Sequence, residues 1–308
     1  ARMRPVRDCL ALGERLSGMS HAPRYVVTLG CPDRTGIVAR IATFLADLGG
    51  SIVEAAYHAD ADSGWFFTRQ AVDAASIDIG VDELRERFAT VAAEIGPDTE
   101  WAVHDSSVRK RVVLLVSKEG HCLHDLLGRA AGGELPATID AVIGNHPDLE
   151  AVTRAHGTPF HHVPFPSDPA ERGPSFAQLR ELVDSYDPDA VVLARFMQVL
   201  PEELCDHWAG RALNIHHSFL PSFVGARPYH QAFARGVKLI GATCHYVTAE
   251  LDAGPIVEQD VIRVDHADAV SDMVRQGRDI EKLVLARGLR WHLEDRVLVH
   301  GRKTVVFS

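Results

Sequence analysis

The sequence predicts an α/β protein built from two parts, a small ferredoxin-like βαββαβ domain followed by a larger α/β domain with a mainly parallel sheet. Three observations support this prediction. From Tyr25 to about residue 104, four strand-like runs and two helical segments follow one another in the order of a ferredoxin-like unit. The stretch HDSSVRKR, residues 104–111, is a polar link. Beyond it, β-rich runs alternate with helices, as right-handed βαβ crossovers require.

The first part begins after residues 1–24, which lack a sustained hydrophobic period and are interpreted as a tail. The run YVVTLG predicts a buried strand, CPDRTG ends it, and apolar residues at helical spacing follow, with Asp33 or Thr35 as the expected helix cap. Two strand-like runs, SIVEAAYHA and GWFFTRQAV, flank the turn-prone DADSG, and a second helix and the strand EWAVH complete the unit. The expected boundaries are residues 25–104 for this domain, 105–110 for a linker and 111–308 for the second domain.

The second part is expected to contain the sheet strands RVVLLVS, ATIDAVIG, DAVVLARF and RALNIHH, with helices between them. LIGATCHYV and PIVEQDVIRV predict longer strands on either side of the turn ELDAG. Residues 269–295 predict one long helix, and RVLVHGRKTVVF predicts a closing hairpin. A chain of 308 residues of which 46% are apolar is long enough to give each part its own core.

Composition and charge argue against several classes of protein. The net charge of −10 comes without a basic stripe, so nucleic acid is not an expected partner. The sequence contains neither an apolar run of roughly 18 residues nor the apolar centre of a secretory signal, so we expect a cytoplasmic protein without a membrane partner. The five cysteines form no CxxC pair, which argues against a disulfide framework or a thiolate metal site.

Polar side chains at two predicted strand ends suggest a catalytic group. Ligands of open parallel sheets collect at the carboxyl ends of strands, where Asn214 and His216 stand and where the loop carrying Asp252 can return. An asparagine amide can donate to a tetrahedral oxyanion, a histidine can exchange protons near neutral pH, and a carboxylate can orient that histidine. From spacing alone, a turn asparagine and a pair of partly buried surface histidines remain open alternatives. The three residues would form an acyl-transfer site that requires no metal.

The stretch LNIHHSFLPSFVGARPYHQAFARGVKLIGATCHYVTAELDAGPIVEQDV resembles the Rossmann-type formyltransferase fold that uses 10-formyltetrahydrofolate, in which an Asn-x-His motif and a downstream Asp form the catalytic group. The resemblance extends over roughly residues 110–265 and includes KEGHCLHDLL, IGNHPDL and VVLARFMQVLP. The N-terminal CPDRTGIVARIATFLADLGGSI resembles an ACT domain. This pair of domains is similar to the formyltetrahydrofolate deformylase family.

The resemblance implies hydrolysis of 10-formyltetrahydrofolate by water to tetrahydrofolate and formate, supplying formate for purine synthesis and balancing one-carbon pools. It implies a cytoplasmic homo-oligomer, associated through both domains, that needs no cofactor and no metal. Glycine and methionine are the candidate amino-acid effectors. The residues implied to bind folate are Phe196, Met197, Gln198, Val199, Leu200, Ala249, Glu250 and Leu251, and those implied to form an effector site are Asp33, Arg34, Thr35 and Gly36. His217 and Gly225 are candidates for supporting the pocket, and a structural role for His217 on the opposite side of the strand remains open.

Several alternatives remain open. One is a folate-dependent formyltransferase acting on a small amine. Transferases that formylate a phosphorylated ribosyl amine carry a glycine-rich phosphate loop after the first strand, whereas this chain has SKEGHCLHDLL. Glu119 would repel a phosphate there, although Lys118 would compensate in part. The others are an amino-acid-binding regulatory protein and a zinc hydrolase, for which His121 and His124 lack evident further ligands.

Overall fold

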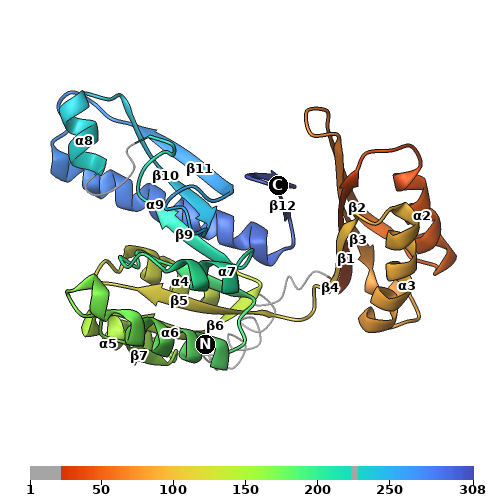
Figure 1. Ribbon diagram of the computed structural model, residues 1–308, viewed down its shortest axis with the longest axis horizontal. Helices are drawn as coiled ribbons and strands as arrows, with labels where there is room; N and C mark the ends of the chain where they lie inside the picture. The colour runs from red at the N-terminus through yellow and green to blue at the C-terminus, as the bar shows by residue number, and fades with distance from the viewer. Residues whose placement is uncertain (1–21, 223–227) are drawn as a thin grey trace, which may run out of the picture. The chain divides into compact units, whose positions relative to one another are not determined.

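The computed structural model describes residues 22–222 and 228–308, so Gly225 and most of the predicted tail lie outside the described residues. The described part of the chain divides into two compact units, with the boundary between Val108 and Arg109 (Figure 1). The division falls within the polar stretch at residues 104–111.

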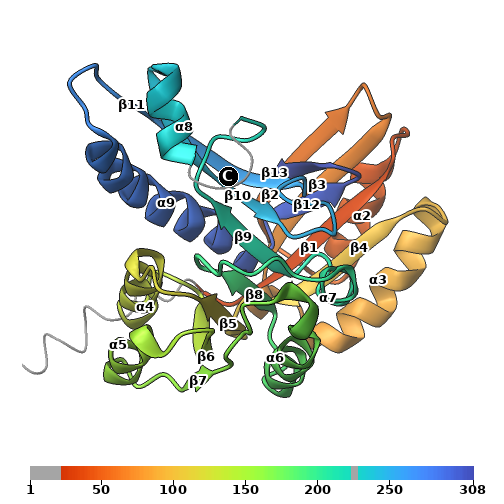
Figure 2. The same ribbon diagram turned by 60° about the vertical axis from the view of Figure 1, so that its left-hand side comes forward.

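The first unit is a four-stranded antiparallel sheet in the order β2-β3-β1-β4, with α2 and α3 on one of its faces (Figure 2). This is the predicted βαββαβ order, in keeping with a small ferredoxin-like domain. Its elements are β1 (Arg24–Pro32), α2 (Ile37–Asp47), β2 (Ile52–Asp60), β3 (Trp65–Asp73), the 3-10 turn η1 (Ala74–Ser76), α3 (Val81–Ile95) and β4 (Glu100–Asp105).

The core of the first unit lies between the sheet and its two helices. Ile41 of α2 and Phe88 of α3 are fully buried against alternate residues of β1 such as Leu29. The prediction that Asp33 or Thr35 caps α2 is wrong. Gly36 is the N-cap residue; it makes no side-chain cap and has φ 98°, a left-handed conformation that glycine adopts without a steric penalty.

The second unit is built on a seven-stranded sheet in the order β11-β10-β9-β8-β5-β6-β7. The pairs among β5 to β9 are parallel, whereas β10 is antiparallel to both β9 and β11, so the sheet is mainly parallel, as predicted. Its strands are β5 (Lys110–Val116), β6 (Ala137–Gly144), β7 (Phe160–His162), β8 (Ala190–Leu193), β9 (Ala212–His216), β10 (Leu239–Tyr246) and β11 (Ile256–Arg263).

Helices cover both faces of this sheet, which explains why β5 is a continuous apolar run. Leu114 of β5 faces the core shared with α4 and α9, and Leu115 faces the core shared with α6 and α7. The remaining elements are α4 (His121–Ala131), η2 (Pro147–Leu149), α5 (Glu150–Ala155), η3 (Pro169–Glu171), α6 (Gly173–Ser185), α7 (Glu202–His207), α8 (Pro228–Arg235), α9 (Val270–Leu293), β12 (Val297–His300) and β13 (Lys303–Val306). The long helix and the closing hairpin were both predicted.

Two glycines let α9 approach its neighbours closely. A Cβ atom on Gly277 would overlap the ring of Tyr229, and one on Gly288 would lie 2.6 Å from Sγ of Cys244 in β10. Both contacts are closer than packed side chains allow. Within residues 22–222 and 228–308, no helix is long and apolar enough to cross a membrane.

Candidate active site

A cavity of about 540 Å³ in the second unit lies at the carboxyl ends of β8 and β9. The segment after β8, the end of β9 and the loop after β10 contribute most of its wall, and residues of α7, α8, α9 and the segment after β5 also line it. The cavity therefore lies at the carboxyl ends of the parallel strands, where the sequence predicted a catalytic group. Asn214, His216 and Asp252 all line it.

His216 and Asp252 form a buried pair in this cavity. Nδ1 of His216 lies 3.2 Å from Oδ1 of Asp252, and the two side chains are only 6% and 8% exposed. Burial acts to raise the pKa of Asp252, but the hydrogen bond and charge of His216 outweigh it and the pKa is lowered. An ionised carboxylate only accepts hydrogen bonds, so the proton of a neutral His216 lies on Nδ1. Nε2, which is buried and has no hydrogen-bond partner among the described residues, then carries a lone pair.

Asn214 is oriented by a histidine that the sequence analysis missed. Nδ1 of His245 lies 2.8 Å from the carbonyl oxygen of Tyr246, which only accepts, so Nδ1 is protonated. Burial lowers the pKa of His245 and keeps the ring neutral, so its Nε2 accepts a hydrogen bond from Nδ2 of Asn214 at 3.2 Å. The amide orientation of Asn214 is thereby fixed, and its second N–H is left for a ligand. The β9–β10 register pairs these two residues. In the sequence, the feature that could have pointed to His245 is its position within the apolar run LIGATCHYV.

The loop that carries Asp252 is held close to the end of β10. Asp252 has φ 56°, a left-handed conformation that non-glycine residues adopt uncommonly and that costs roughly 1 kcal/mol or more. Two residues later, a Cβ atom on Gly254 would overlap the carbonyl oxygen of Tyr246. Glycine at this position therefore permits the close approach that returns Asp252 to His216.

A second group of buried polar side chains lies beside the first. Glu281 of α9 is 1% exposed and accepts hydrogen bonds from Tyr229 Oη at 2.6 Å and from His121 Nε2 at 2.8 Å. Nε of Arg195 lies 3.5 Å from the same carboxylate, and Nη1 of Arg195 contacts Nδ1 of His217. Arg195, His217, Tyr229 and Glu281 all line the cavity. His217 therefore lies in the wall of the pocket. No motif in the sequence indicated that Arg195 and Glu281 would lie there.

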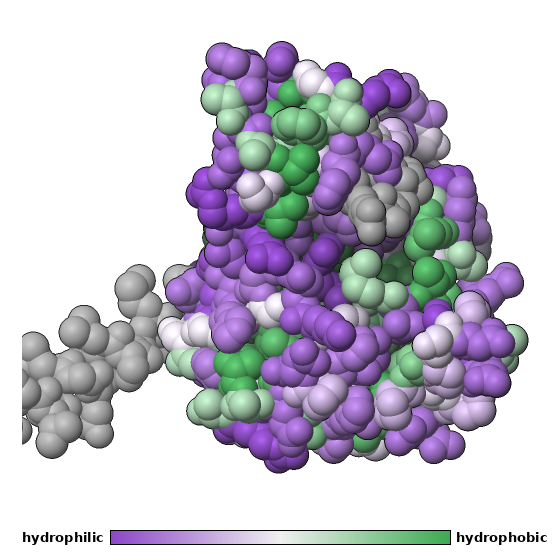
Figure 3. Space-filling model, turned by 90° about the vertical axis from the view of Figure 1, so that its left-hand side faces the viewer, coloured by the Kyte–Doolittle hydropathy of each residue, from purple (hydrophilic) through white to green (hydrophobic). Residues whose placement is uncertain are grey.

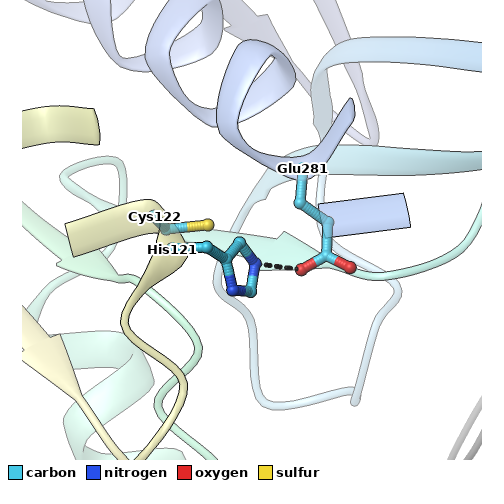
Figure 4. Close-up of side chains that lie close together, drawn as sticks. All are labelled: His121, Cys122 and Glu281. Atoms are coloured by element: carbon cyan, nitrogen blue, oxygen red, sulfur yellow. Dashed lines mark hydrogen bonds and ion pairs between the residues drawn. The ribbon is translucent and has the colours of Figure 1, made fainter. Parts of the chain in front are cut away.

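His121, Cys122 and Glu281 bring three potential metal-ligand atoms within 4.8 Å of one another (Figure 4). His124, the other histidine considered for a metal, does not belong to this group. Both oxygens of Glu281 already accept hydrogen bonds, and the guanidinium of Arg195 supplies the positive charge beside them. Burial also raises the pKa of the Cys122 thiol, which disfavours the thiolate that a metal would need. The surrounding hydrogen-bond donors and the guanidinium of Arg195 thus stabilise the buried carboxylate of Glu281 and leave it poorly suited to bind a metal cation.

Residues predicted to bind folate are found in the cavity wall with one exception. Met197, Val199 and Leu251 are more than half exposed and give the cavity an apolar rim. Figure 3 shows one face of the protein, which is mostly hydrophilic with scattered apolar patches. Glu250 is not among the lining residues, and its carboxylate lies 3.4 Å from Arg302. The other predicted folate residues that line the cavity are Phe196, Gln198, Leu200 and Ala249.

The segment after β5 carries an ion pair where a transferase would carry its phosphate loop. Oε2 of Glu119 lies 2.6 Å from Nη2 of Arg278, and both residues line the cavity. A Cβ atom on Gly120 would lie 2.9 Å from Cδ2 of Leu149, so packing against this leucine accounts for that glycine.

The four residues predicted to form an effector site lie in the turn between β1 and α2 of the first unit. The backbone N–H of Asp33 donates to the carbonyl of Gly64 at 2.8 Å, and Arg34 donates to the carbonyl of Glu94 at 2.7 Å. Thr35 is exposed, and Gly36 precedes the first turn of the helix. The turn is well anchored, and amino-acid binding there stays a prediction.

Comparison with known proteins gives consistent results. A model of the formyl transferase family matches residues 110–289. The chain is 44% identical over 288 residues to a formyltetrahydrofolate deformylase from Corynebacterium, covering 94% of this chain and 99% of that protein. A crystal structure of a formyltetrahydrofolate deformylase from Pseudomonas syringae is 53% identical, with a TM-score of 0.91 over 98% of this chain and all of that one. A glycinamide ribonucleotide transformylase from Symbiobacterium toebii is 32% identical, with a TM-score of 0.61 over 65% of this chain and 95% of that one.

Proposed function

Because the chain belongs to the formyltetrahydrofolate deformylase family, we propose that it hydrolyses 10-formyltetrahydrofolate to tetrahydrofolate and formate. The observation that carries the proposal is the site itself. Two lining residues of one cavity each have a group available to a substrate. His216 has an unbonded Nε2, while its Nδ1 contacts Asp252. Asn214 has a second N–H, while its first N–H binds His245. A base and an oxyanion donor are the two groups that hydrolysis of a formamide needs.

In the proposed reaction, His216 carries a proton from the attacking water to the leaving nitrogen. Water adds to the formyl carbon while Nε2 of His216 accepts a proton from it, and the carbonyl oxygen becomes an oxyanion that accepts a hydrogen bond from Asn214. The ionised Asp252 stabilises the resulting imidazolium through Nδ1. The C–N bond then breaks as His216 returns the proton to the leaving nitrogen. Tetrahydrofolate leaves, the formic acid releases its remaining proton to solvent and leaves as formate, and no metal or other cofactor takes part in this scheme.

The cavity wall supports water rather than an amine as the acceptor. A phosphorylated amine would have to bring its phosphate near the segment after β5, where Glu119 and Arg278 are paired. Placing a dianion beside the carboxylate of Glu119 costs free energy, and Arg278 could pair with the phosphate only by leaving Glu119. The transformylase from Symbiobacterium toebii is similar over 65% of the chain, whereas the deformylases match nearly all of it.

The folate part of the substrate would occupy the apolar rim. A flat heterocycle suits a slot with apolar side chains and exposed main-chain groups, and the segment at residues 196–200 offers both beside the Asp252 loop. The backbone N–H of Met197 donates to Ser117 Oγ at 2.9 Å, which fixes the start of this segment.

The remaining parts of the proposal concern the setting of the reaction. Formate released in the cytoplasm would supply purine synthesis and balance one-carbon pools. The first unit would act as an ACT domain that binds glycine or methionine, and the chain would form a homo-oligomer through both units, without nucleic acid or membrane as a partner. Ile52, Val53 and Tyr57 of the edge strand β2 are exposed apolar residues, which is typical of a surface that pairs with another subunit.

The test is to supply purified protein with 10-formyltetrahydrofolate alone and to measure free formate and tetrahydrofolate. We expect equal amounts of both products without an added acceptor. If formate appears only after an amine is added, the protein is a transferase instead.

A further inference from the structure

We propose that Arg195, held by the buried carboxylate of Glu281, keeps His217 as a neutral imidazole whose Nε2–H is a second hydrogen-bond donor to the oxyanion beside His216. The inference rests on the proposed hydrolysis and adds a residue to it. His217 would touch the reacting atoms, whereas Arg195 and Glu281 would be positioning residues. The rings of His216 and His217 lie with their centroids 5.3 Å apart, and both line the cavity.

The tautomer of His217 follows from its partner. A guanidinium only donates hydrogen bonds, and Nη1 of Arg195 contacts Nδ1 of His217. Nδ1 must therefore accept, and the proton of the neutral ring must lie on Nε2. Among residues 22–222 and 228–308, no hydrogen-bond partner of this Nε2 is found. The free N–H is thus available to a ligand in the cavity.

The charges around His217 keep it neutral. Burial, followed by the positive charge of Arg195, lowers its pKa to about 4. His216 acts in the same direction, and the negative charges of Glu281 and Asp252 act in the opposite direction without reversing the shift. At neutral pH the ring is therefore a donor at Nε2 and an acceptor at Nδ1, and it does not compete with His216 for the proton in transit.

Arg195 is fixed in place from two sides. Burial acts to raise the pKa of Glu281, but hydrogen bonding from His121 and the charge of Arg195 outweigh it, so the carboxylate stays ionised. A buried anion of this kind is costly unless a cation and hydrogen-bond donors surround it, which ties the guanidinium to this position. The backbone of Arg195 has φ 66°, a strained conformation for a residue with a side chain. Strain of this kind persists where the surroundings impose it, often at functional sites.

Oxyanions of acyl-transfer reactions are commonly bound by more than one donor, and loss of one donor typically costs about 10²–10³ in kcat. Asn214 offers one free N–H, because His245 accepts from the amide nitrogen as well. His217 directly follows the strand that carries Asn214 and His216, and it lines the same cavity.

The first experiment determines the tautomer without using activity. We would label histidines with ¹⁵N in the full chain, assign His217 by the signal lost in His217→Gln, and record spectra between about pH 5.5 and pH 8. We expect the Nε2–H tautomer throughout. A protonated Nδ1 or an imidazolium in this range would overturn the inference, whether or not the protein hydrolyses the folate.

The second experiment measures kinetics of the variants. His217→Leu should lower kcat by about 10²-fold with less than about threefold change in KM, whereas His217→Gln, which retains an N–H near the position of Nε2, should recover at least about tenfold of that loss. His156→Leu is the matched control because His156 is exposed and lies outside the cavity lining. A His217→Leu variant with the wild-type kcat would overturn the donor role.

The third experiment tests the positioning role of Arg195. In Arg195→Lys the charge is kept but the planar fork is lost, so we expect His217 to show a mixture of tautomers and kcat to fall in proportion to the lost Nε2–H form. An unchanged His217 spectrum in a folded Arg195→Lys variant would show that the arginine does not set the tautomer. If the wild-type protein releases no formate, the proposed hydrolysis fails, and the two spectra still decide whether the tautomer is set as inferred.

Discussion

His216 and Asp252 meet through Nδ1 and Oδ1 at 3.2 Å, although one residue ends β9 and the other lies in the loop after the neighbouring antiparallel strand. Because β10 runs in the opposite direction to β9, the loop that follows β10 has to turn back to reach the end of β9 that carries His216. The left-handed conformation of Asp252 and the bare backbone of Gly254 make that return possible. The site therefore depends on a turn as much as on the polar residues in it.

Replacing Asn214, His216 or Asp252 by alanine should lower kcat by two or more orders of magnitude, because each change removes an oxyanion donor, the proton carrier or its anionic partner. Formate release under saturating substrate gives the rate, and circular dichroism checks the fold. Asp206→Ala, on the exposed side of α7, is the control and should keep the wild-type rate. An Asp252→Ala variant with a near-normal rate would remove Asp252 from the mechanism.

The stabilising effect of Asp252 should depend on pH. Its pKa is lowered in the folded protein, so the folded state favours the ionised form; the resulting stability is present above the ordinary carboxyl value and is lost as the pH falls through the folded value. We expect the difference in unfolding free energy between the wild type and Asp252→Asn to shrink below about pH 4. Urea denaturation from neutral to acid pH measures it. A difference that grows on acidification would contradict the assigned ionisation.

Glycinamide ribonucleotide should not accelerate consumption of 10-formyltetrahydrofolate. The phosphate of this amine would meet the Glu119–Arg278 pair instead of a glycine-rich cradle. The measurement compares formate and tetrahydrofolate released with and without the amine. A clear increase in tetrahydrofolate without matching formate would move the protein to the transferases.

Gly254→Ala should destabilise the second unit and lower kcat, since a Cβ atom there would overlap the carbonyl oxygen of Tyr246 and push the Asp252 loop away. We expect a loss of about 1–3 kcal/mol in unfolding free energy, as for other overpacked positions. Gly128→Ala in α4 is the matched control: nothing lies within 4 Å of its Cβ position, and alanine favours a helix. Equal stability of the two variants would show that the loop can relax without cost.

Glycine or methionine should change the rate of the full chain if the turn at residues 33–36 binds an effector. A carboxylate can be accepted by free N–H groups at the start of α2, where Gly36 provides no side-chain cap. Regulation further requires that the effector bind the active and less active states with different affinities. Initial rates with each amino acid and calorimetric titration test this. Absence of both effects would leave the first unit as a scaffold.

Both units of the fold could be predicted from the sequence, because hydrophobic periods mark their elements. Strand ends pointed to Asn214 and His216 as candidates, and the resemblance to the formyltetrahydrofolate deformylase family implied the full group with Asp252. Asn214 and His216 come at the end of an apolar run, and that position alone brings them to the cavity. His245 could not be assigned in the same way, because its partnership with Asn214 depends on the register between two strands.

Arg195 and Glu281 were missed for related reasons. Glu281 is one of many charged residues in a long helix, and only the rotation of α9 about its axis buries it against the cavity. The predicted capping of α2 by Asp33 or Thr35 failed because Gly36 takes the left-handed conformation at the helix start. The burial of Glu281 and the conformation at the start of α2 both depend on three-dimensional packing, which a hydrophobic pattern does not reveal.

The close packing at Gly277 and Gly288 also limits which substitutions α9 can accept during evolution. A side chain at position 277 is compatible with the fold only if Tyr229 shrinks or moves, and one at position 288 only if Cys244 does. The tyrosine in turn binds the carboxylate of Glu281, so a substitution at Gly277 reaches the polar group beside the cavity within two contacts. We therefore expect positions 277 and 229 to coevolve, and likewise 288 and 244, rather than to vary independently.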